Sequence, residues 1–317
     1  MTSDDIALRP KNVADYIGQD TIRADLDVAT RAAQQRHEAL PHLLLSGPPG
    51  LGKTSLAQAV AASMGVRCRV TTAPMLNTRE QMSKALWALG VKDVLFIDEI
   101  HRLRPEMEEL FYPAMEDEMF EFIVAPNTEP MRLPLPPFTL IGATTKPGLL
   151  TAPMRARFGL TYRLDYYSQT TLVDILERAA GLLGVKLASS AAADLALRSR
   201  GTPRVANRLL RRARDYALVN GQELITQALV EQAMIAAGVD RRGLDTTDRA
   251  LLTALVTQFD GGPVGVDTLA GAVSEDTETV ENAYEPYLMR LGLLARTPRG
   301  RVATTKTYEL VDAPGKV

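Results

Sequence analysis

The chain has 317 residues, of which 46% are hydrophobic and 23% charged, and its formal net charge is −2 at pH 7. This length and balance favour a globular protein of roughly two or three domains, and the small net charge excludes a surface that is basic all over. No apolar run approaches the length needed to span a bilayer, and the single cysteine, Cys68, cannot form an internal disulfide. We therefore expect a cytoplasmic protein without a membrane anchor.

The first 167 residues alternate between short apolar segments and helical segments. We expect strands at residues 42–46, 67–71, 93–97, 139–143 and 160–164, with helices at 53–64, at 79–89 and from Pro105 onward. Strands that alternate with helices predict an α/β fold with a doubly wound parallel sheet. In such a sheet, ligands bind at the carboxyl ends of the strands.

A β-hairpin is expected to interrupt this alternation at residues 120–135. Its strands, 120–124 and 131–135, flank a proline-rich tip. We expect the hairpin to expose its large apolar side chains, which are Phe120, Phe122, Ile123, Met131 and Leu133. Two interpretations remain open: a flap packed on its own domain, or a docking hairpin for a partner protein.

Residues 168–242 read as a small all-helical domain. Ser168 is a plausible N-cap, and Pro203 opens an amphipathic helix. Seven arginines and no acid lie between Asp194 and Asp215. If the protein meets a polyanion, we expect local patches of this kind to bind it.

Residues 243–317 read as a winged helix. A helix at 251–259 is followed by two shorter ones near 268–273 and 277–288, and then by a turn between two short strands. The would-be recognition helix carries five acids, which phosphate would repel: Glu275, Asp276, Glu278, Glu281 and Glu285. The turn carries Arg296, Arg299 and Arg301, so we expect contact with a nucleic-acid backbone through the wing, with little sequence preference. A solvated basic loop is the alternative.

Residues 47–54 read Gly-Pro-Pro-Gly-Leu-Gly-Lys-Thr, the pattern of a phosphate-binding loop. Glycines such as Gly50 and Gly52 let backbone amides approach phosphate oxygens, with help from the positive end of the following helix. Lys53 supplies a charge to the β- and γ-phosphates, and the Thr54 hydroxyl is a magnesium ligand. We therefore expect the chain to bind ATP or ADP with Mg²⁺.

The strand at 93–97 leads into two carboxylates, Asp98 and Glu99. We expect Asp98 to complete the magnesium shell and Glu99 to activate the attacking water as a general base. Thr145 (or Thr144), at the end of the neighbouring strand, is a candidate for holding that water or sensing the γ-phosphate. Arg157, like Arg155 nearby, is either a surface ion-pair residue or an arginine that completes a neighbouring subunit's site.

Eight short motifs together resemble the RuvB family of AAA+ ATPases along nearly the whole chain. They are Leu-Arg-Pro-Lys at 8–11, Tyr-Ile-Gly-Gln at 16–19, the phosphate loop, Asp-Glu-Ile-His-Arg-Leu at 98–103, Tyr-Pro-Ala-Met-Glu-Asp at 112–117, the segment 136–145, Arg-Gly-Thr-Pro-Arg at 200–204 and the wing at 296–301. The resemblance implies an AAA+ P-loop domain at 1–167, a helical lid at 168–242 and a C-terminal winged helix at 243–317. It also implies an ATP-driven motor for Holliday junction branch migration.

The resemblance further assigns roles to individual residues. The nucleotide site it implies comprises Leu8, Arg9, Gly50, Gly52, Lys53, Thr54, Ser55, Glu116, Asp117, Glu118 and Tyr167. Thr145 is the implied first sensor, Arg204 the second sensor in the lid, and Arg157 the finger acting on the neighbouring subunit. Arg296 and Arg301 are the implied DNA contacts.

The same resemblance implies partners. These are double-stranded DNA at Holliday junctions, RuvA bound through the hairpin 120–135, RuvC in the same complex, and further copies of the chain in a hexameric ring. The sequence departs from the family pattern in the hairpin, where residues 124–131 replace a Gly-rich stretch. Two rival functions remain open: a clamp-loader or initiator ATPase, and a nucleotide-gated DNA-binding switch that barely hydrolyses ATP.

Overall fold

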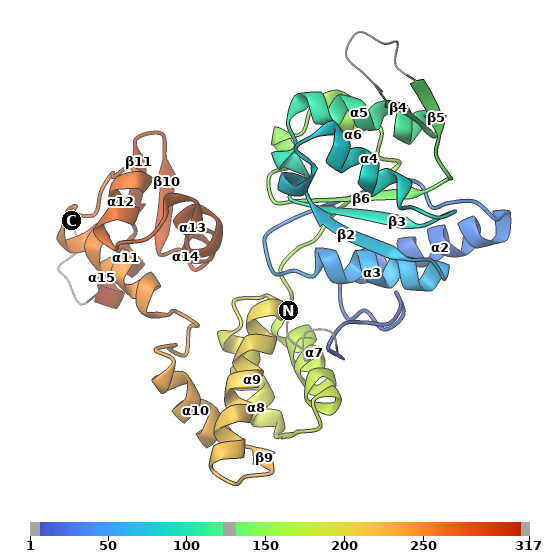
Figure 1. Cartoon of the computed structure of the whole chain (residues 1–317). Helices are drawn as coiled ribbons and strands as arrows, with labels where there is room; N and C mark the ends of the chain where they lie inside the picture. The colour runs from blue at the N-terminus through green and yellow to red at the C-terminus, as the bar shows by residue number, and fades with distance from the viewer. Residues whose placement is uncertain (1–6, 123–130, 312–317) are drawn as a thin grey trace. The chain divides into compact units, whose positions relative to one another are not determined.

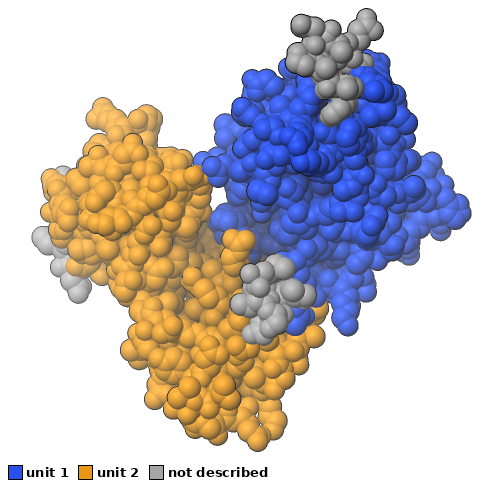
Figure 2. Space-filling model, in the orientation of Figure 1, with its two compact units in different colours: residues 1–167 blue, residues 168–317 orange. Residues whose placement is uncertain are grey.

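The computed structural model describes residues 7–122 and 131–311 of the chain. It divides into two compact units, residues 1–167 and residues 168–317, which Figure 2 shows in blue and orange. No helix among these residues is long and apolar enough to cross a membrane.

The first unit is built on a five-stranded sheet with the order β2-β3-β6-β1-β7, and every neighbouring pair is parallel. The strands are β1 (Leu43–Ser46), β2 (Cys68–Thr72), β3 (Val94–Asp98), β6 (Thr139–Thr144) and β7 (Leu160–Arg163). Helices α2 (Asp20–Arg36) and α3 (Lys53–Met64) cover one face, and α4 (Arg79–Trp87), α5 (Pro105–Glu116) and α6 (Ala152–Ala156) cover the other (Figure 1). This arrangement confirms the doubly wound parallel sheet.

Burial explains why the central strands read as uninterrupted apolar runs. Every residue of β1 and β6 is buried, because helices cover both faces of the sheet. One core cluster joins Leu95 and Ile97 of β3 to Met82 of α4, Phe111 of α5 and Met154 of α6. The sheet is therefore fixed between two helical layers, and the carboxyl ends of its strands are held in register.

The predicted hairpin is present, and its base packs on its own domain. Strand β4 (Met119–Phe122) pairs antiparallel with β5 (Met131–Pro134). The expectation that Phe120 is exposed is wrong: its side chain is fully buried and lies edge-on to Trp87, with ring centroids 6.4 Å apart. Met131 is exposed, as expected. The tip, with Ile123, lies outside the described residues.

The lid segment contains α7 (Gln169–Leu182), α8 (Ser189–Arg198), α9 (Pro203–Val219) and α10 (Gln227–Ala236). The Ser168 hydroxyl accepts a hydrogen bond from the Thr171 amide, and the Thr202 hydroxyl accepts one from the Val205 amide, so both predicted helix starts are capped. The structure adds a two-residue parallel ladder between β8 (Lys186–Leu187) and β9 (Leu224–Ile225). So short a ladder gives no alternation pattern to find in the sequence.

The winged-helix segment follows with α11 (Thr246–Thr257), α12 (Val266–Ala272), α13 (Thr277–Thr279), a π-helical turn (Val280–Tyr284) and α14 (Glu285–Arg290). Strands β10 (Leu294–Thr297) and β11 (Gly300–Ala303) form the wing. A terminal helix, α15 (Thr305–Val311), was not predicted; its Leu310 packs on a core that includes Leu251, Leu255 and Leu288. These elements confirm the winged helix.

Candidate functional site

The phosphate loop joins β1 to α3, and its backbone takes conformations that favour glycine. Gly47, Gly50 and Gly52 have φ values of 138°, 82° and 98°. A Cβ atom at Gly47 would lie 2.5 Å from the Leu164 carbonyl oxygen, and one at Gly52 would lie 2.6 Å from the Tyr16 hydroxyl oxygen. The loop therefore has room only for glycine at these turns, which leaves its amides open to a bound anion.

Lys53 lies against this loop. Its side chain is buried, and Nζ donates hydrogen bonds to the carbonyl oxygens of Gly47 at 2.6 Å and Pro48 at 3.0 Å. Thr54 and Ser55 follow in the first turn of α3 and are half-buried. A cation and two hydroxyls thus stand at the positive end of a helix, which is the chemistry that binds a polyphosphate.

The residues at this edge of the sheet fit a magnesium ion. No group of three or more His, Cys, Asp and Glu side chains that could hold a metal occurs among the described residues. Mg²⁺ in nucleotide sites needs no such cage, because water and phosphate oxygens fill most of its shell. Thr54 and Asp98 supply oxygen ligands of the kind Mg²⁺ prefers.

The predicted base, Glu99, lies at the carboxyl end of β3, where β6 is the neighbouring strand. Its backbone is left-handed, with φ of 50°, and its carboxylate accepts a hydrogen bond from the Thr145 hydroxyl at 3.3 Å. His101 Nδ1 lies 3.2 Å from the same carboxylate and 2.9 Å from the Thr144 hydroxyl. Thr145, not Thr144, therefore contacts the predicted base, and His101 contacts the same carboxylate oxygen.

Two tyrosines donate hydrogen bonds to the backbone of the phosphate loop. The hydroxyls of Tyr16 and Tyr167 lie 2.9 Å apart, and both donate to the Leu51 carbonyl oxygen, at 3.1 Å and 3.0 Å. Burial raises the pKa of both tyrosines, so both stay neutral donors. The prediction placed Tyr167 near the nucleotide and did not select Tyr16, because two tyrosines 151 residues apart give no local pattern.

The N-terminal pair predicted for the nucleotide site lies beside the same helix. Leu8 is buried, and the Arg9 guanidinium donates to the Gln58 side chain of α3 at 2.5 Å. The contact between Arg9 and Gln58 could not be predicted from the sequence, because the two residues are 49 positions apart. The contact fixes the segment around Arg9 to the helix that follows the phosphate loop.

Arg157 directly follows α6 and contacts residues of both α5 and α6. Its Nη2 lies 3.2 Å from the Glu116 carboxylate, its Nη1 donates to the Pro153 carbonyl oxygen at 2.9 Å, and its guanidinium lies 3.9 Å from the Tyr112 ring centroid. Asp117 and Glu118 follow directly after α5. The described residues give Arg157 no hydrogen bond or ion pair with its own phosphate loop.

Arg204 lies in the first turn of α9 and is exposed. Within the described ranges its guanidinium forms no ion pair or hydrogen bond. The arginine-rich segment around it is not a uniform basic surface, however. Arg198 is fully buried and paired with Asp194 and Glu231, so that arginine cannot meet a polyanion.

The wing places its arginines over an acid of the recognition helix. Glu285 has a side chain only 1% exposed, and both Arg296 and Arg301 pair with it, Arg296 at 2.5 Å. Arg301 also lies 3.1 Å from Glu281 and is 12% exposed, whereas Arg299 is exposed at the turn. Two of the five acids predicted to repel phosphate, Glu281 and Glu285, thus hold the wing in place.

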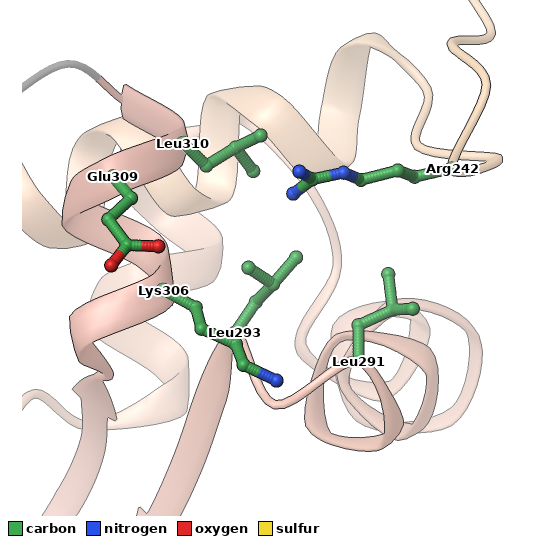
Figure 3. Close-up of a pocket in the computed structure, with 6 residues that line it drawn as sticks. All are labelled: Arg242, Leu291, Leu293, Lys306, Glu309 and Leu310. Atoms are coloured by element: carbon green, nitrogen blue, oxygen red, sulfur yellow. The ribbon is translucent and has the colours of Figure 1, made fainter.

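The winged-helix segment also contains a cavity of about 530 Å³. Figure 3 shows Arg242 reaching into it from the segment before α11, and Lys306 and Glu309 extending from α15. Leu291, Leu293 and Leu310 complete its lining. It includes no phosphate-loop residue and no predicted site residue, so it is separate from the nucleotide site.

A phosphate loop after β1, an acidic pair after β3, a hydroxyl after β6, a helical lid and a winged helix define a P-loop ATPase of the AAA+ class. Family models match the chain throughout: the Holliday junction DNA helicase RuvB P-loop domain at residues 8–164, the RuvB AAA lid domain at 167–240 and the RuvB C-terminal winged helix domain at 241–312. The chain belongs to the RuvB family.

Solved structures support the same family assignment. The chain is similar to the Thermotoga maritima RuvB Holliday junction branch migration motor, with 42% identity and a TM-score of 0.88 over 98% of this chain and 100% of that one. A point mutant of the same Thermotoga maritima protein matches with 42% identity and a TM-score of 0.89, over 98% of this chain and 99% of that one. The family and the fold predicted from the sequence are thereby confirmed.

Proposed function

We propose that this chain is an ATP-driven motor that moves the branch point of Holliday junctions in recombination and DNA repair in the cytoplasm. The observation that carries the proposal is the meeting of the phosphate loop, the Asp98–Glu99 pair and Thr145 at one edge of the sheet, with the Thr145 hydroxyl on the Glu99 carboxylate. ATP with Mg²⁺ binds there through Lys53, Thr54, Ser55 and Asp98, and Glu99 deprotonates the attacking water.

The proposal includes a hexameric ring. Arg157 supplies positive charge to the γ-phosphate of a neighbouring subunit, which accords with its lack of a bond to its own phosphate loop among the described residues. Glu116 pairs with Arg157, so the acids 116–118 reach the nucleotide from the same neighbour. Arg204 senses the nucleotide from the lid, and Leu8, Arg9 and Tyr167 line the rest of its site.

The DNA partner is met by the wing, through Arg296, Arg299 and Arg301, at phosphates rather than bases. The hairpin 120–135 docks RuvA, and RuvC joins the same complex. The buried base of the hairpin supports this role, because Phe120 anchors a projecting element whose Met131 remains exposed. The lid and winged-helix matches to RuvB favour this function over a clamp loader or initiator.

A junction-dissociation experiment tests the proposal. A labelled four-way DNA junction is incubated with the protein, ATP and Mg²⁺, with and without the cognate RuvA. We expect ATP-dependent dissociation that RuvA enhances, and none with Glu99→Gln. If the junction stays intact under every condition and DNA does not change the rate of ATP hydrolysis, the proposal is wrong.

A further inference from the structure

One arginine joins the lid to the winged helix. Arg200 precedes α9 with a left-handed backbone, φ 53°, and its Nε donates to the Gly243 carbonyl oxygen at 2.9 Å. Its Nη2 donates to the carboxylates of Asp245 at 2.8 Å and Asp248 at 2.5 Å. The guanidinium also lies 5.1 Å from the Tyr287 ring centroid. A single side chain therefore contacts the linker and two helices of the winged helix.

The linker itself, residues 237–245, is held from both sides. Arg198 of the lid donates from Nη1 to the Val239 carbonyl oxygen at 3.1 Å. Arg249 of the winged helix donates from Nη2 to the Gly238 carbonyl oxygen at 2.7 Å. Carbonyl groups that accept from arginines of both flanking segments leave the linker little freedom to bend.

Close packing reinforces these bonds. A Cβ atom at Gly243 would lie only 2.6 Å from the Arg198 carbonyl oxygen, so the linker touches the end of α8 directly. The Tyr287 hydroxyl donates to the Arg242 carbonyl oxygen, while the Arg242 side chain extends into the cavity of Figure 3. Lid and winged helix accordingly form one compact unit, residues 168–317.

Burial makes the contact of Arg200 with Asp248 hard to break. The Asp248 side chain is fully buried and that of Arg200 is 11% exposed. Separating the two leaves the poorly solvated Arg200 guanidinium, which stays charged, without this partner, and that is strongly unfavourable. A hinge between lid and winged helix would have to separate this pair each time it opened.

We propose that Arg200 is a positioning residue that makes α9 and the DNA-contacting wing move as one rigid body. Pro203 and Arg204 begin α9 only a few residues after Arg200, so any movement that nucleotide imposes on α9 reaches the winged helix undiminished. This inference rests on the proposed function, in which Arg204 senses nucleotide and the wing contacts DNA.

The test compares full-length Arg200→Ala with a matched control, Arg241→Ala. Arg241 lies in the same linker, but its side chain is 77% exposed, and its ion pair with Glu231 is loose at 3.9 Å. Amide hydrogen exchange over residues 237–248 should be about tenfold faster, or more, in Arg200→Ala and unchanged in Arg241→Ala. Junction migration per ATP hydrolysed should fall about tenfold in Arg200→Ala, while ATP hydrolysis stays within about threefold.

Tyr287→Phe provides a second variant should Arg200→Ala fail to fold. It keeps the ring under Arg200 and removes only the hydroxyl bond to Arg242, so we expect smaller changes in the same direction. Unchanged exchange in both variants would overturn the rigid joint. Faster exchange with normal migration per ATP would overturn the positioning role. If the wild type moves no junction, the proposed function fails, while the exchange measurement still decides the joint.

Discussion

The Thr145 hydroxyl donates a hydrogen bond to the Glu99 carboxylate across 3.3 Å, and so connects the ends of two neighbouring strands. The carboxylate also lies 3.2 Å from His101 Nδ1, whose side chain is 7% exposed. A base held by two partners is preorganised, because its orientation need not be searched for at each turnover. The residue proposed to sense the γ-phosphate and the residue proposed to activate water are thus in direct contact.

Glu99→Gln should abolish turnover while ATP binding remains. The amide keeps the shape and still accepts from Thr145, but it cannot take a proton from water, so we expect ATP hydrolysis to fall by about 10²–10⁴. Phosphate release and nucleotide-binding titrations measure the two effects. Glu109→Gln, at an exposed position of α5, is the control and should hydrolyse ATP normally. ATP hydrolysis at the wild-type rate in Glu99→Gln would show that Glu99 is not the general base.

Arg157→Ala should lose hydrolysis by about 10³–10⁵ without losing nucleotide binding, because transition-state charge on the phosphate goes unneutralised. Arg155→Ala, at an exposed position two residues earlier, is the matched control. Mixing Arg157→Ala with Glu99→Gln subunits should restore part of the activity, since some interfaces then combine an intact base with an intact arginine. No recovery on mixing would mean that Arg157 acts within its own subunit, or not at all.

The wing arginines should separate into structural and DNA-binding roles. Arg301→Ala removes a partner of the buried Glu285 but leaves it paired with Arg296, and it should lower the unfolding free energy by about 1–3 kcal/mol, measured by chemical denaturation. Arg299→Ala, at the exposed turn, should change stability by less than about 0.5 kcal/mol and weaken DNA binding similarly across sequences. Equal stability of the two variants, or a binding loss confined to one DNA sequence, would contradict this division.

Asp248 should make stability depend on pH. Burial raises its pKa to about 7, while Arg200 opposes that shift and Asp245, Tyr284 and Tyr287 also face it. In the unfolded chain an aspartate has a pKa of about 3.9. Between these values the folded state keeps a proton that the unfolded state releases, so this residue's contribution to stability falls as pH rises toward about 7.

Asp248→Asn tests that prediction, because an amide does not titrate. Its unfolding free energy, relative to that of the wild type, should rise with pH between about 4 and 7, by up to about 1.4 kcal/mol per pH unit. Chemical denaturation of both proteins at several pH values measures the difference. Parallel pH profiles would show that Asp248 titrates at an ordinary pKa.

Local patterns were enough to predict much of the fold and to select the residues that meet at the centre of the candidate nucleotide site. The phosphate loop is a contiguous motif, and strands β1, β3 and β6 are buried on both faces, so their apolar runs stand out in the sequence. The strand predicted at residues 42–46 is Leu43–Ser46 in the structure. Asp98 and Glu99 stood out because two adjacent acids directly follow the apolar run of β3.

What escaped prediction depends on distant partners. Arg198 and Arg200 looked like members of a basic surface. Besides the nearby Asp194, however, Arg198 pairs with Glu231, 33 residues later, and Arg200 pairs with Asp248, 48 residues later. Phe120 looked exposed because a hairpin pattern does not reveal that Trp87 lies beside its base. His101 carries no signal of its own, since only the turn after β3 brings its ring to Glu99.

The acid beneath the wing has a consequence for the proposed binding and release of DNA. Arg296, held by Glu285, is already ordered, so less rotamer entropy is lost when it meets a phosphate. The same carboxylate cancels part of its attraction for the polyanion. Binding that is preorganised yet weak favours quick detachment, which suits the proposed movement along a duplex.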